Sequence, residues 1–168
     1  GMGVNSAADR ARKARKMVVE MLSADQPERE TSHDPDSKFW NWASDIGVSE
    51  SRLPQRGGPS VDQSHPAMRV NLDACIHCNL CVRACREVQV NDVIGMAYRG
   101  HGAKIVFDFD DPMGESTCVA CGECVQACPT GALMEATLLD DNQTRINYPD
   151  KKVDSVCPYC GVGCQVTY

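Results

Sequence analysis

Eleven cysteines dominate the chemistry that this 168-residue sequence could perform. Eight of them fall into two sets with the same spacing, C-x2-C-x2-C-x3-C. The first set is Cys75, Cys78, Cys81 and Cys85, and the second is Cys118, Cys121, Cys124 and Cys128. A loop with a thiolate at every third residue can wrap three corners of an inorganic iron–sulfur cube. The spacing therefore predicts two [4Fe–4S] clusters.

The fourth cysteine of each set lies about one helical turn beyond the third, so its side chain leaves the loop. In bacterial two-cluster ferredoxins with this spacing, each set gives three thiolates to one cube and its fourth thiolate to the other. We therefore expect two ligand sets, Cys75, Cys78, Cys81 and Cys128 for the first cluster, and Cys118, Cys121, Cys124 and Cys85 for the second. Pro129, which has a fixed φ and no N–H, suits the end of the second turn.

Disulfides and zinc are weaker interpretations of the same thiols. Disulfides need an oxidising compartment, whereas the sequence shows no secretory signal and has an odd number of cysteines. Zinc usually takes paired C-x2-C knuckles, which this closer packing of thiols fits poorly. His77 is expected to be a polar neighbour of the first cluster and not a ligand, because four cysteines already serve each cube. Gly122 either lets the backbone approach the second cube or is an ordinary turn glycine.

Composition limits the partners of the chain. The net charge is −6 and the pI about 5.1, which argues against nucleic acid. No apolar run is long enough to cross a membrane, so no membrane partner and a cytoplasmic location are expected. Only 5% of the residues are aromatic, and we expect bound metal to supply order that a small core cannot.

Two helices and a linker are expected before the first cysteine set. The first helix is predicted over residues 7–24, begun by a capping box of Ser6 and Asp9. One of its faces is basic and is either simply solvated or a docking surface for an acidic partner; it carries Arg10, Arg12, Lys13, Arg15 and Lys16. Residues 49–66, which contain several prolines and glycines, are predicted to be a linker.

The second helix is predicted to start at Asp34-Pro35, as cap and first residue, and to end at Gly47. Its packed face is expected to contain Phe39, Trp42, Ala43 and Ile46.

Short strands are expected around the cysteine sets. Residues 68–72 and 145–148 each suggest a strand. Residues 93–98 and 103–109 suggest a hairpin that turns at Gly100-His101-Gly102, with Ile105, Phe107 and Phe109 on one face. The predicted fold class is α+β: a two-[4Fe–4S] bacterial ferredoxin-like domain with an inserted β-hairpin, preceded by one or two N-terminal helices.

Three more cysteines, Cys157, Cys160 and Cys164, form an incomplete third set with the spacing C-x2-C-x3-C. No fourth cysteine follows them in this sequence. We expect a third [4Fe–4S] cluster here only if a fourth ligand is supplied from elsewhere.

The order of the three motifs supports a resemblance to a known family. Residues 73–133 resemble the ferredoxin-type domain of the α subunit of cytoplasmic, NAD-dependent molybdenum or tungsten formate dehydrogenases. They are also similar to that region in the large iron–sulfur subunit of respiratory complex I. The likeness is carried by C-I-H-C-N-L-C-V-R-A-C-R-E-V-Q at 75–89 and C-V-A-C-G-E-C-V-Q-A-C-P-T-G-A-L at 118–133. D-S-V-C-P-Y-C-G-V-G-C at 154–164 resembles the opening of the molybdopterin-binding domain.

Two departures from the family are visible. Members carry an N-terminal [2Fe–2S] domain, and many then carry a cluster site of one histidine and three cysteines. Here no cysteine occurs before Cys75, so neither site can be built from these residues. The resemblance implies a piece of a larger subunit: an N-terminal helical segment and linker over 1–66, the two-cluster domain over 67–150, and the start of a molybdopterin-oxidoreductase domain over 151–168.

The resemblance implies an electron-transfer module that relays electrons from formate oxidation at a molybdopterin site toward a flavin/NAD subunit. The chain itself is then non-catalytic, its partners are that subunit and the remainder of its own subunit, and molybdopterin belongs to the intact parent. Alternatives are a stand-alone ferredoxin, the related complex I region, or an assembly protein that docks through its first helix. The third cysteine set favours the first hypothesis, because exposed thiolates on a free ferredoxin would oxidise.

Overall fold

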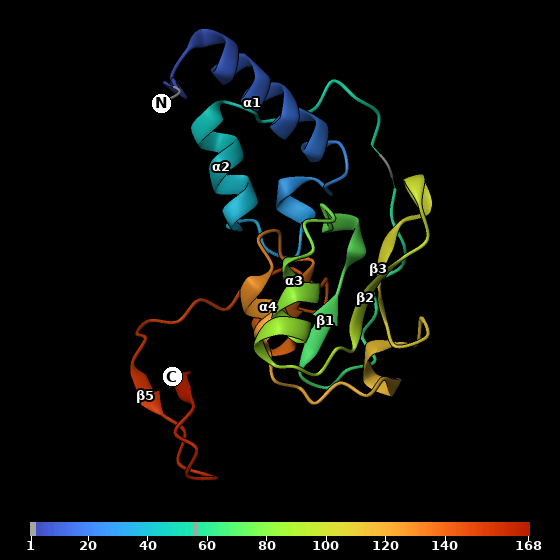
Figure 1. Ribbon diagram of the computed structural model, residues 1–168, viewed down its shortest axis with the longest axis vertical. Coiled ribbons are helices and arrows are strands. Elements are labelled where there is room, and N and C mark those ends of the chain that lie inside the picture. Colours follow the sequence, from blue (N-terminus) through green and yellow to red (C-terminus); the bar gives the residue numbers. More distant parts are fainter. Residues whose placement is uncertain (1–2, 56) are drawn as a thin grey trace.

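The computed structural model describes residues 3–55 and 57–168. Figure 1 shows a pair of N-terminal helices above a central body of short helices and strands, with a C-terminal hairpin that extends away from that body. This mixed arrangement agrees with the predicted α+β class.

The two predicted N-terminal helices are present, but both begin later than expected. The first, α1, spans Asp9–Ser23 and is capped by Ala8, so the predicted capping box at Ser6 is wrong. The side chain of Asn5 instead accepts the N–H of Ala7 and turns the chain just before the helix. The second, α2, spans Lys38–Ile46 and ends at Gly47 with a φ of +75°, as predicted.

The predicted start of α2 at Asp34-Pro35 is wrong because Asp34 has other partners. Its carboxylate accepts the N–H of Asp36 and pairs with the guanidinium of Arg145, which holds residues 34–36 in a turn. The cap is Ser37, whose hydroxyl accepts the N–H of Trp40.

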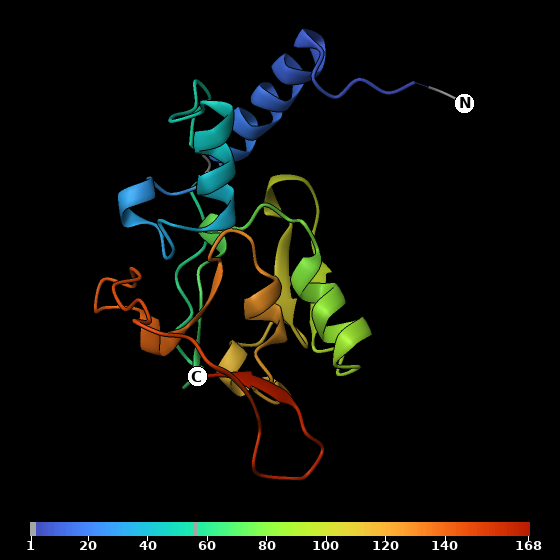
Figure 2. The same ribbon diagram turned by 90° about the vertical axis from the view of Figure 1, so that its left-hand side faces the viewer.

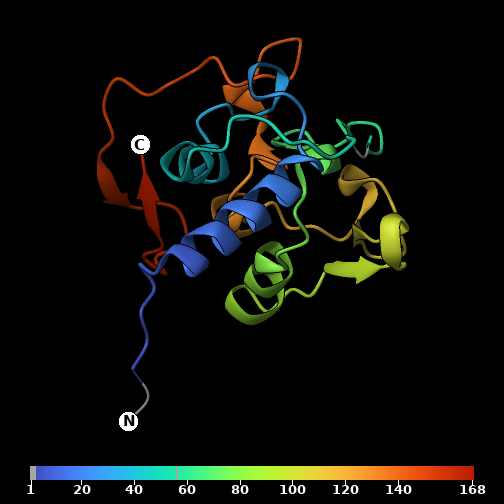
Figure 3. The same ribbon diagram turned by 90° about the horizontal axis from the view of Figure 1, so that it is seen from above.

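The helices share a small core of their own, made by Phe39, Trp40, Ala43 and Val48, with Val19, Leu22 and Ile46 packed against it. Trp42, predicted on the packed face, is instead 56% exposed, and Trp40 takes its place. On α1, Met17, Val18 and Met21 remain about half exposed, so α2 covers only part of the apolar stripe. Figure 3 shows α1 crossing above the central body beside α2.

The central body contains two short antiparallel sheets. Strand β1, Met68–Val70, pairs with β4, Leu133–Glu135, and confirms the strand predicted near residue 68. Strand β2, Ile94–Ala97, pairs with β3, Lys104–Phe107, through a turn at Gly100–Gly102, which confirms the predicted hairpin.

Two short helices complete the central body. Helix α3, Leu80–Arg83, continues directly into a π-helical turn at Ala84–Val88, and α4 spans Glu123–Ala127. Further 3-10 turns lie at Arg29–Thr31, Leu72–Ala74, Met113–Glu115 and Ala136–Leu138. The central core is formed by side chains from β1, β2, β3, β4, α3, the π-helical turn, α4 and the turn at Met113–Glu115, among them Val70, Ile105, Phe107, Met113 and Leu133, together with Cys81, Cys85 and Cys124.

One residue of the predicted hairpin face does not join the core. Ile105 and Phe107 are buried, whereas Phe109 is 96% exposed. The strand ends before it because Asp108 has a φ of +47° and its carboxylate accepts the N–H of Thr117.

The predicted linker is in close contact with the central body. Asp62 and Val70 exchange backbone hydrogen bonds, and the Asp62 carboxylate accepts the N–H of Met113 at 2.7 Å. The Ser64 hydroxyl accepts the N–H of Gly114. Residues 62–64 therefore lie along β1, and the division of the chain at residue 66 stays a prediction.

The C-terminal part differs most from expectation. The strand predicted over residues 145–148 is wrong, since Arg145 makes only an isolated bridge to Leu139. An unpredicted hairpin forms instead from β5, Asp154–Val156, and β6, Gln165–Thr167. Within residues 3–55 and 57–168, no helix has the length and apolar character needed to span a bilayer.

Candidate iron–sulfur centres

Two loops with matching backbone geometry carry the first three cysteines of each set. His77 in the first loop and Ala120 in the second have φ values of +55° and +58°. In both loops this residue donates its N–H to the sulfur two positions earlier, at 3.5 Å to Cys75 and 3.4 Å to Cys118. Because alanine serves equally well in the second loop, the position requires the backbone amide and not the imidazole of His77.

A second left-handed residue begins the helix after each loop. Asn79 has a φ of +62° before α3, and Gly122 has a φ of +79° before α4. A Cβ built at Gly122 meets nothing within 4 Å in the described chain. Gly122 has the positive φ of a turn glycine, and Asn79 shows that asparagine adopts the same conformation, while the approach of the backbone to a cube stays a prediction.

The fourth cysteine of each set lies just after the short helix that follows the loop. Cys85 lies in the π-helical turn after α3, and Cys128 follows directly on α4. Cys85 is buried and its sulfur accepts the N–H of Val93 at 3.4 Å. The sulfur of Cys128 lies 3.6 Å from the hydroxyl of Thr130. An amide N–H thus points at sulfur in both sets, and the second set has a hydroxyl beside Cys128 as well.

The folded chain brings three thiols of each set together with the fourth of the other. The pKa of the Cys81 thiol is raised to about 12, mainly by burial and then by the neighbouring thiols of Cys128, Cys75 and Cys78. We call these four cysteines the first thiol group; all of them line one small cavity, together with Leu72, Ile76, Ile105 and Leu133.

The second thiol group consists of Cys118, Cys121, Cys124 and Cys85. Burial raises the pKa of Cys124 to about 12, and Cys118, Cys121 and Cys85 lie close enough to raise it as well. Burial also raises the pKa of Cys118, which is close to Cys121 and Cys85. The thiol of Cys124 also lies close enough to raise the pKa of Cys81, so the two thiol groups are neighbours.

These donor sets fit two iron–sulfur cubes. Each group offers four thiols, apolar walls or buried positions, and N–H groups directed at sulfur, which are the means by which proteins hold and tune such clusters. In the described part of the chain, no three Cys, His, Asp or Glu side chains lie close enough to hold one metal ion directly. That separation is compatible with a cube, in which each thiolate binds a different iron.

The third cysteine set lies on the C-terminal hairpin, apart from the two thiol groups (Figure 1). Cys157 donates its N–H to the carbonyl of Cys164 at 2.8 Å, which closes the loop between β5 and β6. Cys160 and Cys164 are exposed and Cys157 is half-buried. The hairpin therefore places three thiols on one exposed loop.

A contact between the N-terminal segment and the first thiol group was not predicted from the sequence. Residues 26–39, which we call the N-terminal strap, run from the end of α1 into α2 and lie between the helices and the central body (Figure 2). Phe39 donates its N–H to the carbonyl of Pro129 at 2.9 Å. In the sequence, the polar run around His33 was the local sign of such a contact, because Pro129 and Arg145, which the strap contacts, lie about a hundred residues further along the chain.

His33 is the most unusual residue of the strap. It is 1% exposed, and neither ring nitrogen has a hydrogen-bond partner among the described residues. Burial lowers its pKa from 6.5 to about 4. The backbone of Gly131 lies near the ring and favours its charged form, although the two do not meet the geometry of a hydrogen bond. The positive charge of Arg69 disfavours the charged form. The imidazole is therefore neutral at pH 7.

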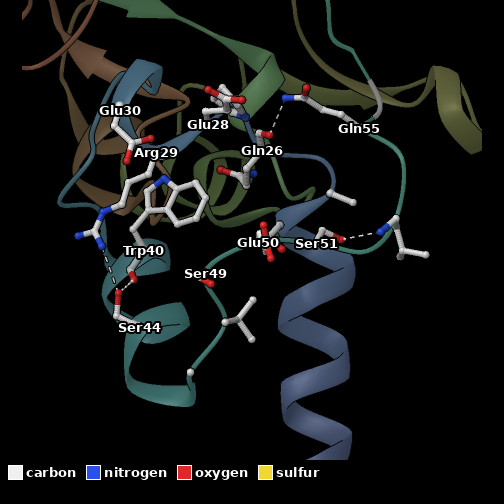
Figure 4. A pocket seen from close by; sticks show the side chains of 16 residues that line it. Gln26, Glu28, Arg29, Glu30, Trp40, Ser44, Ser49, Glu50, Ser51 and Gln55 are labelled. Atoms are coloured by element: carbon white, nitrogen blue, oxygen red, sulfur yellow. Dashed lines mark hydrogen bonds between the residues drawn. The ribbon is translucent and has the colours of Figure 1, made fainter.

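A cavity of about 630 Å³ lies between the end of α1, the strap and α2. Figure 4 shows Trp40 in its wall and the hydrogen bond, 3.2 Å long, from the Arg29 guanidinium to the hydroxyl of Ser44. The same guanidinium donates to the carbonyl of Pro35. No cysteine is in its lining, so it is separate from the thiol groups, and its polar wall helps to fix the strap.

Comparison with known proteins agrees with this geometry. Residues 74–132 match the family model described as "4Fe-4S dicluster domain". A Bacillus subtilis protein named "Probable oxidoreductase YjgC" is 32% identical over 160 residues, which cover 74% of this chain and 16% of that protein. A Staphylococcus haemolyticus protein named "Putative formate dehydrogenase" is 29% identical over 153 residues, covering 70% of this chain and 16% of the relative. The chain thus spans about a sixth of the length of these relatives.

A solved structure supports the fold. The crystal structure of an NAD+-reducing [NiFe]-hydrogenase in the H2-reduced state superposes with a TM-score of 0.67 and 23% identity, over 78% of this chain and 57% of that chain. The hydrogenase thus shares the fold, and the named relatives and the dicluster domain confirm the resemblance inferred from the cysteine motifs. The chain is therefore an iron–sulfur electron-transfer module with a 4Fe-4S dicluster domain, related to proteins named formate dehydrogenase.

Proposed function

We propose that this module relays electrons within an NAD-dependent formate dehydrogenase, between a molybdopterin site and a flavin/NAD subunit. The observation that carries the proposal is the pair of adjacent thiol groups, in a chain whose relatives include proteins named formate dehydrogenase. The overall reaction is HCOO⁻ + NAD⁺ → CO2 + NADH, in which two electrons and one proton leave formate and a hydride equivalent reaches NAD⁺. The chain supplies only the path for the electrons.

The proposed ligands follow the thiol groups. Cys75, Cys78, Cys81 and Cys128 hold the first cluster, and Cys118, Cys121, Cys124 and Cys85 hold the second. A bound [4Fe–4S] cluster accepts and releases one electron at a time. The hairpin thiols Cys157, Cys160 and Cys164 hold a third cluster together with a fourth ligand from outside the described residues.

The residues of this chain set the conditions for transfer. Because iron binding requires thiolates, the thiols with raised pKa values give up their protons on loading. The N–H groups of His77, Ala120 and Val93 point at cysteine sulfur and would stabilise negative charge on a cluster held there. Apolar neighbours such as Leu72 and Ile105 keep water from the first cluster. The chain itself transfers no group and is non-catalytic.

The test begins with the intact complex, purified without oxygen. Formate should reduce the clusters of this chain, as seen by electron paramagnetic resonance (EPR), and NAD⁺ should reoxidise them. Dithionite serves as the control that all clusters are reducible. Clusters that respond to dithionite but not to formate would overturn the assignment to formate oxidation while leaving the iron–sulfur module intact.

A further inference from the structure

The N-terminal strap contacts both flanks of the first thiol group. Gln26 donates its side-chain N–H to the carbonyl of Ala74, the residue before Cys75, at 2.9 Å. At the other end, Phe39 donates its backbone N–H to Pro129, the residue after Cys128. The strap therefore touches the chain next to two of the four thiols, from segments that are far apart in sequence.

A buried ion pair clamps the middle of the strap. The carboxylate of Asp34 lies 3.3 Å from the guanidinium of Arg145, and both side chains are less than one-fifth exposed. Arg145 also donates its backbone N–H to the carbonyl of His33 at 2.8 Å. Gly131 also lies close to the strap, because a Cβ placed there would be 2.6 Å from the Cβ of Asp34. Gly131 and Arg145 thus both contact the strap at residues 33–34.

Tyr148 links Arg145 to a further residue of the strap, Asp36. The Arg145 guanidinium stacks over the ring of Tyr148, 4.8 Å from its centroid. The hydroxyl of Tyr148 donates to the carboxylate of Asp36 at 2.8 Å. Residues 145–148, which the sequence suggested as a strand, are therefore the fixed support of the strap.

The two thiol groups differ on some flanks, although each has one exposed thiol, Cys78 in the first and Cys121 in the second. Val119, beside Cys118, is 63% exposed, and Val88 and Val90, three and five residues after Cys85, are 63% and 80% exposed. Around the first group, Ala74 is 0% and Thr130 1% exposed. The strap is hydrogen-bonded to Ala74 and Pro129 beside the first group, and no hydrogen bond among the described residues joins it to a residue beside the second.

We propose that the strap is a fixed cover of the first cluster, which excludes water and sets its potential apart from that of the second, and that Asp34 and Arg145 are its positioning residues. This inference rests on the proposed ligand sets. Reduction adds negative charge to a cluster, and water stabilises that charge. Covering one cluster and not the other therefore lowers the potential of the covered one.

The experiment uses the anaerobically purified chain and its Arg145→Met variant, in which the clamp is lost. Redox titrations followed by EPR give the two midpoint potentials, and deuterium exchange seen by pulsed EPR reports water near each cluster. Cys75→Ser and Cys118→Ser variants assign the signals. The potential of the first cluster should rise and its deuterium coupling should increase, while the second cluster stays unchanged.

Two variants control for general effects. Arg145→Lys keeps the charge beside Asp34 and should restore both readouts toward wild type. Arg52→Met makes the same chemical change at the ion pair with Glu20, away from the thiol groups, and should move neither potential. If Arg145→Met fails to fold, Gln26→Met, which removes only the contact with Ala74, should shift the first cluster in the same direction.

The outcomes separate the two proposals. Fewer than about eight irons per wild-type chain, the content of two four-iron cubes, would overturn the ligand sets themselves. With full iron content, an unchanged first cluster in the folded variant, or equal shifts of both clusters, would overturn the cover and leave the electron-transfer function standing.

Discussion

Acidification should destabilise this protein through one buried residue, His33. The ring is 1% exposed and its pKa falls from 6.5 to about 4 because burial disfavours the charged form. In the unfolded chain, the same imidazole takes up a proton near its ordinary pKa. Between these two values the unfolded state binds more protons than the folded state, so stability is present above pH 6.5 and is lost as the pH falls toward 4.

The magnitude follows from the two pKa values. A shift from 6.5 to about 4 corresponds to about 3 kcal/mol in full, at about 1.4 kcal/mol for each pKa unit. Integrating the linkage relation between pH 7.5 and pH 5.5 gives a loss of about 1.3 kcal/mol, because only part of the transition lies in that range. This range also limits acid damage to the clusters.

The assay is urea unfolding under anaerobic conditions at the two pH values, followed by circular dichroism. Wild type is compared with His33→Gln, which cannot titrate, and with His101→Gln, which removes an exposed histidine. The free-energy loss on acidification should be about 1.3 kcal/mol smaller for His33→Gln than for wild type. It should be unchanged for His101→Gln. Equal losses in wild type and His33→Gln would refute the reasoning, since protons taken up by clusters and carboxylates cancel in this difference.

Three further predictions follow from the thiol groups and the strap. Cys85→Ser should remove the EPR signal of the second cluster and keep that of the first, and Cys128→Ser should do the reverse; loss of the wrong signal in either variant would contradict cross-ligation. Gly131→Ala should destabilise the chain by about 2 kcal/mol or more, because its φ of +75° is strained for alanine and the new methyl meets Asp34. Gly102→Ala, which has open space, is the matched control in urea unfolding. Removing iron with a chelator should abolish the cooperative unfolding of the central body, because three of its core residues are cysteines; an iron-free chain with an unchanged thermal transition would argue against it.

The predictable part of the fold is the part governed by short-range spacing. The cysteine loops, the turn at Gly100–Gly102 and the end of α2 at Gly47 depend on residues within a few positions of one another. The grouping of Cys128 with the first set could also be predicted, because the spacing rule of two-cluster ferredoxins implies it.

The missed features depend on distant partners. Asp34 reads as a helix cap, yet its carboxylate is taken by Arg145, more than a hundred residues later. Trp42 and Trp40 could each have faced inward by helical spacing, and the packing of α2 against α1 places Trp40 in the small core between the helices. Phe109 continues the apolar alternation, but the positive φ of Asp108 ends the strand first.

The exchange of Cys85 and Cys128 between the two thiol groups also has a consequence for biosynthesis. Neither group is complete in the first half of the central body, because Cys75, Cys78 and Cys81 wait for a residue that emerges much later from the ribosome. A nascent chain stopped between the two loops would therefore present incomplete sites only. On the proposed ligand sets, the second site is complete only after translation of residue 124 and the first only after residue 128. A single proteolytic cut between the two loops, followed by separation of the pieces, would disable both centres at once.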